Sequence, residues 1–156
     1  MTDSGAGKVD TTRQVATVAQ LRRLEVTAAT PGRRIAPVEL TTYQVDALLI
    51  GWKQPPDKDF HLVIASPGNR SQTMIAEIPS PTCPELCRTG AAARYAALRR
   101  QLVDRLGGPP AARYRRLPQP LPVRLVGVGF FDFEHFETGA APNAIELHPV
   151  LKIEFR

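Results

Sequence analysis

Cysteine is nearly absent from the chain, since Cys83 and Cys87 are the only two among 156 residues. Two cysteines cannot build the disulfide framework of a small secreted domain, and in a cytoplasmic protein they are expected to be free thiols. Their CxxxC spacing supplies two of the four ligands that a structural zinc site needs, and no histidine lies near them in the sequence. We therefore expect no metal role for this pair.

Long apolar runs are also missing, and no stretch approaches the roughly 20 residues that a membrane-spanning helix requires. The first ten residues, MTDSGAGKVD, lack the apolar core of a signal peptide. These absences predict a cytoplasmic protein that does not enter a membrane.

Several catalytic and nucleotide-binding motifs are absent. The loop TGAAPN at residues 138–143 is too poor in glycine to hold a phosphate, and neither a Walker pattern nor GxGxxG occurs in the chain. Ser66, Ser71 and Ser80 have no nucleophile-elbow context. The sequence therefore gives no support for a P-loop enzyme, a dinucleotide-binding enzyme or a serine hydrolase.

Positive charge is in excess, with a formal net charge of +5, and it is localised. Residues 88–124 carry nine arginines and one acid, Asp104, whereas residues 129–156 carry five acids against Lys152 and Arg156. A positive net charge permits an anionic partner without requiring one. A binding surface that uses both segments is therefore expected to be positively charged in one part and negatively charged in the other.

The last third of the chain has the strongest strand patterns. Residues 145–155 alternate between apolar and polar with a period of two, and residues 123–133 are rich in valine and phenylalanine. Pro149 cannot donate a hydrogen bond to a β-ladder, so we expect a sheet edge or a bulge there.

Three more strands and one helix are predicted upstream. Turn residues separate the strands, and an apolar stripe at helical spacing marks the helix, with Arg94, Arg99, Arg100 and Arg105 pointing away from that stripe. A basic, proline-rich connector is expected to follow the helix. The predicted strands cover residues 43–52, 59–66 and 72–78, the helix covers residues 91–106, and the connector covers residues 111–122.

The order strand–strand–strand–helix–strand–strand is that of an OB-fold. This fold is a five-stranded Greek-key barrel with a helix between strands three and four. We predict a mainly β, OB-like domain over residues 38–156, with the strand order 1-2-3-5-4 closing back on strand 1; a small α+β sandwich shares the element order. Residues 1–37 are predicted to be a disordered or weakly helical N-terminal appendage.

Four phrases carry a resemblance to a known group of proteins: DFHLVIAS, TMIAEIPSP, VGVGFFDFEH and APNAIELHPVLKI. They resemble those of a bacterial family of uncharacterised hypothetical proteins, some of which are exported. The resemblance covers about residues 35–155. It implies no activity and no catalytic residues, because none is established for that family.

All three histidines lie close to carboxylates in the sequence: His61 beside Asp59, His135 after Asp132, and His148 beside Glu146. In the OB order, three adjacent strands would point their polar residues outward together. Mixed imidazole and carboxylate sets can hold a divalent metal, which can activate water. The candidate metal ligands are His61, Glu77, Glu146 and His148, with Asp59 or His135 as a base. The alternative is an ordinary solvated strand surface.

A second candidate site is the usual ligand face of an OB-fold, which runs along strands two and three and the loops beside them. Aromatic side chains near cations suit stacking on nucleic-acid bases. The candidate ligand-binding residues are Trp52, Lys53, His61 and Phe136. The acids on the same face oppose this interpretation, because they repel phosphate.

Three functions follow from these patterns. The first is a non-enzymatic OB-like binding domain for single-stranded nucleic acid or another anionic polymer. The second is a metal-dependent hydrolase, acting on phosphodiesters through the outward histidine and carboxylate residues. The third is a protein-interaction module that uses the basic helix, in particular Arg99 and Arg100.

Overall fold

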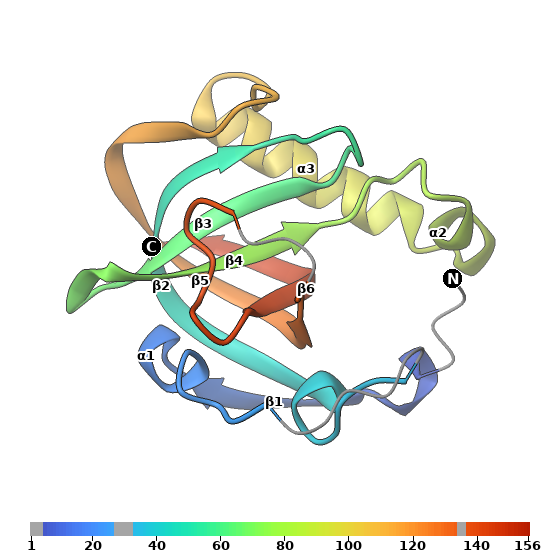
Figure 1. Ribbon diagram of the computed structural model, residues 1–156. Helices are drawn as coiled ribbons and strands as arrows, with labels where there is room; N and C mark the ends of the chain where they lie inside the picture. Colours follow the sequence, from blue (N-terminus) through green and yellow to red (C-terminus); the bar gives the residue numbers. More distant parts are fainter. Residues whose placement is uncertain (1–4, 27–32, 134–136) are drawn as a thin grey trace.

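The computed structural model describes residues 5–26, 33–133 and 137–156 (Figure 1). Six strands form one mixed sheet, and five of them close a ring in the order β2-β3-β4-β6-β5, with β5 pairing back to β2. The mainly β class and the predicted strand order are therefore confirmed. The ring strands are β2 (Thr41–Lys53), β3 (Phe60–Ser66), β4 (Asn69–Ile78), β5 (Arg115–Phe131) and β6 (Ile145–Phe155).

The ring closes because β2 and β5 are long enough to serve two neighbours each. The 13 residues of β2 pair with both β3 and β5, and the 17 residues of β5 pair with both β2 and β6. Apolar side chains at alternate positions point into the ring and form the core, including Val45, Leu49, Leu62, Ile64 and Leu125. The period-two pattern of the sequence is the direct cause of this inner face.

Strand β5 begins earlier than the sequence predicted, because Arg115 and Arg116 pair with Trp52 and Gly51. The prediction of a connector over residues 111–122 is therefore wrong from Arg115 onward. The intervening prolines misled it, since proline removes a donor from the ladder. Pro118 and Pro120 fall where the pairing of β5 with β2 is irregular, so the sheet tolerates them.

Part of the N-terminal segment belongs to the sheet. Strand β1 (Asp10–Ala16) pairs in parallel with β2, and the short helix α1 (Val18–Leu21), with its capping box at Thr17, buries Val18 and Leu21. Residues 10–16 thus form a strand, where the sequence predicted a disordered or weakly helical appendage. The side chains of β1 are almost all exposed, so no alternating pattern marked this strand. Two 3₁₀ turns complete the region, η1 (Ala6–Lys8) and η2 (Val38–Leu40).

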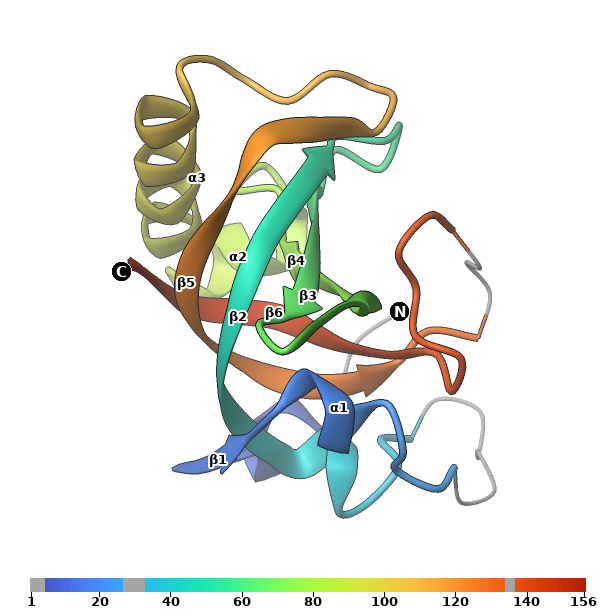
Figure 2. The ribbon, with the colours of Figure 1, turned by 90° about the vertical axis from the view of Figure 1, so that its left-hand side faces the viewer.

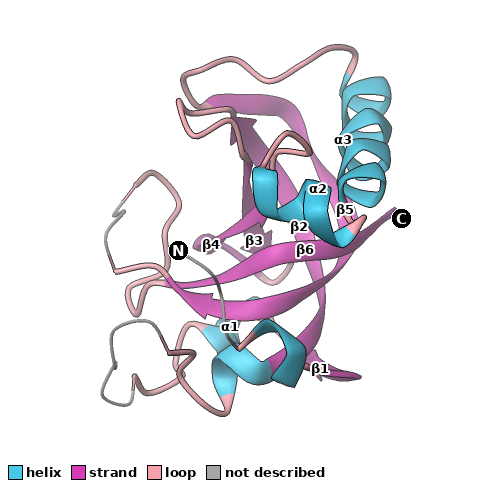
Figure 3. Cartoon of the chain, turned by 90° about the vertical axis from the view of Figure 1, so that its right-hand side faces the viewer, coloured by secondary structure: helices cyan, strands magenta, loops and turns pink. Residues whose placement is uncertain are grey.

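Two helices connect β4 to β5, α2 (Pro84–Thr89) and α3 (Ala92–Leu106), as Figures 2 and 3 show. Helix α3 lies at the end of the ring opposite β1 and α1, and it inserts Tyr95, Leu98 and Leu102 into the core. The predicted apolar stripe is therefore correct at these positions. None of the described helices is long and apolar enough to cross a membrane.

Arg99 was expected on the solvated face of this helix, and the structure buries it. Its guanidinium lies 3.7 Å from the centre of the Phe60 ring, and Nη2 donates to the Lys58 carbonyl at 2.8 Å. A cation over an aromatic face, with its donors satisfied by backbone oxygens, explains the burial. Of the two arginines predicted to form an interaction surface, Arg99 is therefore buried and cannot contact a partner, whereas Arg100 is exposed.

Candidate functional site

Four predicted residues meet on the outer face of β3, β4 and β6. His61 of β3 pairs directly with Glu77 of β4, and Glu146 of β6 pairs with Ile75, two residues before Glu77. His148 follows Glu146 by two residues and lies on the same face of β6, because side chains alternate along a strand. The structure therefore brings together all four residues predicted as metal ligands.

Glu77 is the centre of this group, since its two carboxylate oxygens face different imidazoles. Glu77 Oε1 lies 2.9 Å from His61 Nδ1, and Glu77 Oε2 lies 3.0 Å from His148 Nδ1. Each imidazole nitrogen also faces a second carboxylate: Glu137 Oε1 lies 2.6 Å from His61 Nδ1, and Glu146 Oε1 lies 3.2 Å from His148 Nδ1. Each Nδ1 carries at most one hydrogen atom but has two carboxylate oxygens within contact distance.

The sequence did not single out Glu137, which comes from the loop between β5 and β6. Its second oxygen contacts the ammonium group of Lys53. Loops beside strands two and three were expected at the ligand face, so an acid in such a loop was the available signal. We define the His–carboxylate cluster as Asp59, His61, Glu77, Glu137, Glu146 and His148.

The cluster is covered, whereas the sequence predicted an outward, solvated face. His61, Glu77 and Glu146 are 5%, 6% and 4% exposed. Residues 137–144 cross in front of β3 and β4 (Figure 1), and Gly139 packs so closely on Val63 that a Cβ atom there would lie 2.4 Å from a valine methyl carbon. A polar group removed from water must be paired, so burial makes the contacts among these residues obligatory.

Burial and mutual contacts shift the pKa values in opposite directions. Burial alone would raise the pKa of Glu77, but hydrogen bonds from His148 and His61 outweigh it and lower that pKa to about 2. Burial alone would lower the pKa of His148, and hydrogen bonds to Glu146 and Glu77 instead raise it to about 10. Burial raises the pKa of Glu146 to about 7, because its contact with His148 compensates only in part.

The pKa values of Asp59 and His61 are set by the same two opposing effects, burial on one side and hydrogen bonds and nearby charges on the other. Burial raises the pKa of the Asp59 carboxyl, although the Ser80 amide donates to Asp59 Oδ1 at 2.7 Å. Burial lowers the pKa of His61, and the hydrogen bond and charge of Glu77 reverse this, so the net shift is upward. Contacts with carboxylates therefore favour the cationic form of both imidazoles.

One polar atom in the cluster is left unsatisfied. His61 Nε2 is buried and has no hydrogen-bond partner within residues 5–26, 33–133 and 137–156. Its nearest acid is Asp57, with Oδ2 at 3.5 Å. Unsatisfied buried polar atoms are uncommon in native proteins, and functional sites are one place where they occur.

The second predicted site is not assembled as expected. Trp52 is 4% exposed and packs edge-on against Phe60, with ring centres 5.5 Å apart, so it belongs to the core. Lys53 is engaged with Glu137, and His61 is buried. Phe136 and His135 lie outside the described residues. Trp52 therefore offers no face on which a base can stack.

Both cysteines are free, as predicted, and neither belongs to the cluster.

We compared the chain with protein-family models, with curated proteins and with solved structures, and none of the three comparisons found a match. The chemistry of the site is therefore the guide to its function.

That chemistry is typical of cation binding. Two sets of three donor groups have ligand atoms within 4.8 Å of one another: His61, Glu77 and Glu137 in the first, and Asp59, Glu77 and His148 in the second. Glu77 is common to both sets. Imidazole nitrogen with carboxylate oxygen suits Zn²⁺, Mn²⁺ and Fe²⁺.

Proposed function

We propose that this protein is an OB-like barrel that binds two divalent transition-metal ions at the His–carboxylate cluster and uses them for hydrolysis. The observation that carries the proposal is the position of Glu77, which presents one oxygen to each of two imidazoles. A carboxylate that bridges two cations in this way is a common element of two-metal hydrolytic sites, whose ions lie about 3.5–4 Å apart.

The donor spacing suits a metal ion. Ligand atoms about 2.1 Å from one cation lie about 3.0 Å apart in octahedral geometry and about 3.4 Å apart in tetrahedral geometry. In the first set, the two carboxylate oxygens lie 2.6 and 2.9 Å from His61 Nδ1. In the second, Glu77 lies 3.0 Å from His148 Nδ1. Small side-chain movements would therefore accommodate an ion at either position.

The charge balance also favours divalent cations. With every carboxylate ionised, five negative charges lie opposite at most three positive ones, those of His61, His148 and Lys53. The five acids are Asp57, Asp59, Glu77, Glu137 and Glu146. Buried anions without compensation are costly, so a cation that binds here lowers the free energy of the folded state. With two divalent ions and neutral imidazoles, the cluster would become close to neutral.

The proposed chemistry is phosphodiester hydrolysis. Glu146, which lies beside the second set through its contact with His148, would accept a proton from the attacking water. The oxygen of that water would form its bond to phosphorus as the ester P–O bond breaks, and the leaving alkoxide would take a proton from solvent. Divalent ions held by these residues would lower the pKa of the water and stabilise the charge of the leaving oxygen.

The test is metal content together with stability. Protein purified without chelator is dialysed against Zn²⁺ or Mn²⁺ and analysed by mass spectrometry of the bound metal; we expect about two ions per chain, as in two-metal sites. Glu77→Gln is expected to lose both ions, and Glu137→Gln to lose one. Glu154→Gln, which changes a partly exposed acid on the same strand as His148, is the matched control and should keep both ions.

Activity is then measured with bis(p-nitrophenyl) phosphate as the probe. Metal-dependent release of nitrophenol that EDTA abolishes, and that Glu77→Gln lacks, would support the hydrolase. Bound metal without turnover would limit the function to metal binding. Less than about 0.1 ion per chain in the wild type would overturn the proposal, because a two-metal site cannot function at that occupancy.

A further inference from the structure

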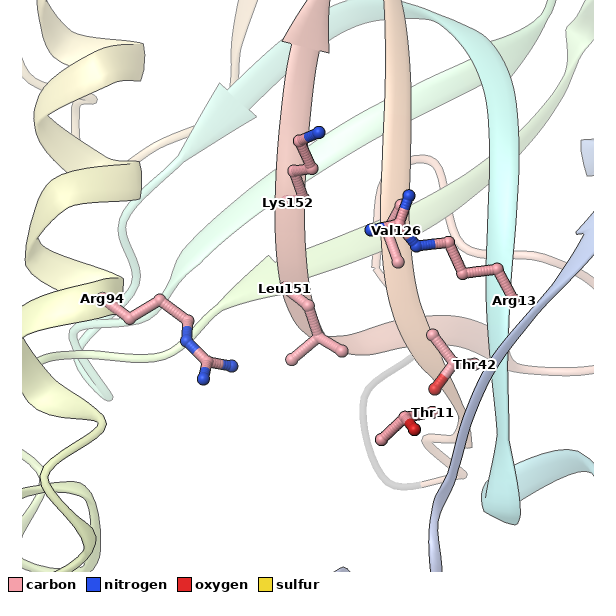
Figure 4. Close-up of a pocket in the computed structure, with 7 residues that line it drawn as sticks. All are labelled: Thr11, Arg13, Thr42, Arg94, Val126, Leu151 and Lys152. Carbon is pink, nitrogen blue, oxygen red and sulfur yellow. The ribbon is translucent and has the colours of Figure 1, made fainter.

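A second site, of opposite charge, lies over β2, β5 and β6, with β1 on one side and α3 on the other. The space has a volume of about 260 Å³. Figure 4 shows Arg94 of α3 on one side and Arg13 of β1 on the other, with Leu151 between them. We call this site the basic groove; it is lined by Thr11, Arg13, Thr42, Arg94, Val126, Leu151 and Lys152.

The groove is positively charged. It contains three cationic side chains, and none of the described residues that line it is acidic. Neither Arg13 nor Arg94 has an ion-pair partner in the part of the chain that the structure describes. Lys152 is engaged by Glu154, with Nζ 2.5 Å from Oε1. Two guanidinium groups therefore remain available to a ligand.

The remaining lining residues give the groove a floor and polar edges. Val126 and Leu151 provide apolar surface from two neighbouring strands. The Thr42 hydroxyl donates to the Asp10 carbonyl at 2.7 Å, which ties β1 to β2 at this point. Arg13 lies on the same short strand as Asp10, so this hydrogen bond helps to hold it beside the groove.

We propose that the basic groove binds the phosphate groups of a single-stranded nucleic acid. Guanidinium groups bind phosphate oxygens through paired, charge-assisted hydrogen bonds, and the two that line the groove come from two different elements. An apolar floor between the cations can accommodate a base or a sugar. This assignment rests on the groove alone and does not require metal at the His–carboxylate cluster.

The groove and the cluster share strand β6. Lys152 follows His148 by four residues, which corresponds to about 13 Å along an extended strand. An extended polyanion held at the groove would therefore reach the region of the cluster within a few nucleotides. If the proposed hydrolysis is also correct, this relation identifies its substrate class.

The experiment uses a fluorescein-labelled 12-nucleotide oligothymidylate and measures anisotropy with the full chain at several salt concentrations, in EDTA so that the cluster holds no metal. We expect the affinity to fall with salt, with a slope of about −1.4 in a log–log plot for two contacts on a single strand. Arg13→Ala with Arg94→Ala should weaken binding about tenfold or more and reduce the slope by about 1.4.

Arg100→Ala is the matched control, because Arg100 is an exposed arginine on the same helix as Arg94 and does not line the groove. It should bind like the wild type, and circular dichroism should show that all variants are folded. Equal weakening in the control, or no binding by the wild type, would overturn the proposal.

Calorimetry with inorganic phosphate distinguishes the two sources of phosphate. A nucleic-acid site should bind free phosphate far more weakly than the oligonucleotide. If free phosphate bound as tightly and in an Arg13- and Arg94-dependent way, the groove would be a small-anion site, and the nucleic-acid assignment would be overturned.

Discussion

The His–carboxylate cluster and the basic groove both involve strand β6, and they treat charge in opposite ways. In the cluster, acids and imidazoles are packed against one another beneath residues 137–144, and both oxygens of Glu77 are engaged. In the groove, no acid among the described residues neutralises Arg13 or Arg94. The net charge of +5 reveals neither arrangement, because it averages an acidic site and a basic one.

The two sites also differ in what their charges do: those of the cluster contribute to the stability of the fold, and those of the groove contribute to ligand binding. Buried charges are held in place by their partners, so removing one leaves the others unpaired in a region of low dielectric constant. Exposed charges are hydrated, so removing one changes the free energy of unfolding very little. We therefore expect substitutions in the cluster to affect the fold and metal binding, and substitutions in the groove to affect ligand binding alone.

The largest effect is expected for Glu77→Gln. This change leaves His61 and His148 without their shared carboxylate, and breaking a buried ion pair costs about 3–5 kcal/mol. Urea unfolding of the metal-free protein should show a loss in that range. Arg13→Ala, from the groove, should change the unfolding free energy by less than about 0.5 kcal/mol. Equal effects of the two substitutions would contradict the distinction between the sites.

Metal addition should raise the melting temperature through the cluster and not through the groove. A ligand present at 100 times its dissociation constant stabilises the folded state by about 2.7 kcal/mol. Thermal melts of the wild type with Zn²⁺ or Mn²⁺ should show a rise that EDTA reverses. The Arg13→Ala, Arg94→Ala double variant should retain this rise and Glu77→Gln should lose it; a rise that persists in Glu77→Gln would place the metal elsewhere.

A smaller loss is expected for Gly139→Ala, which tests the covering of the cluster. Gly139 has a φ of +91°, and an added Cβ would meet Val63 at 2.4 Å. Backbone strain at such a position costs about 1–3 kcal/mol, and relief of the contact would displace the segment that carries Glu137. Denaturant unfolding should show the loss, together with weaker metal binding.

Gly68→Ala is the control for this substitution, because Gly68 lies in a turn where nothing is within 4 Å of an added Cβ. If the two alanine variants were equally stable and bound metal equally, residues 137–144 would not be needed to complete the cluster.

The smallest effect is expected for Glu154→Gln, which frees Lys152 beside the groove. Exposed ion pairs contribute about 0–1 kcal/mol, so the unfolding free energy should barely change. The affinity for the oligothymidylate should rise about twofold, because the charge of Lys152 is no longer shared with an acid. Anisotropy measures this change, and a decrease in affinity would show that Lys152 does not face the bound phosphates.

The sequence predicted much of the sheet and only part of the cluster. The strong alternation at residues 145–155 correctly marked β6, and Pro149 does lie where the pairing with β5 is irregular. Glu137 was missed because its segment has no repeating pattern, and its approach to His61 joins residues 76 positions apart. Contacts of that kind depend on how a loop folds back, which local preferences do not encode.

The sequence by itself determined which side chains share a face, because the two-residue period of a strand follows from backbone geometry. It thereby placed His61, Glu77, Glu146 and His148 together once the strand order was inferred. The tertiary structure alone decided that this face is buried, that Arg99 covers Phe60, and that β1 joins the sheet. Burial and long-range pairing depend on segments distant in the chain, so neither is written in the local pattern.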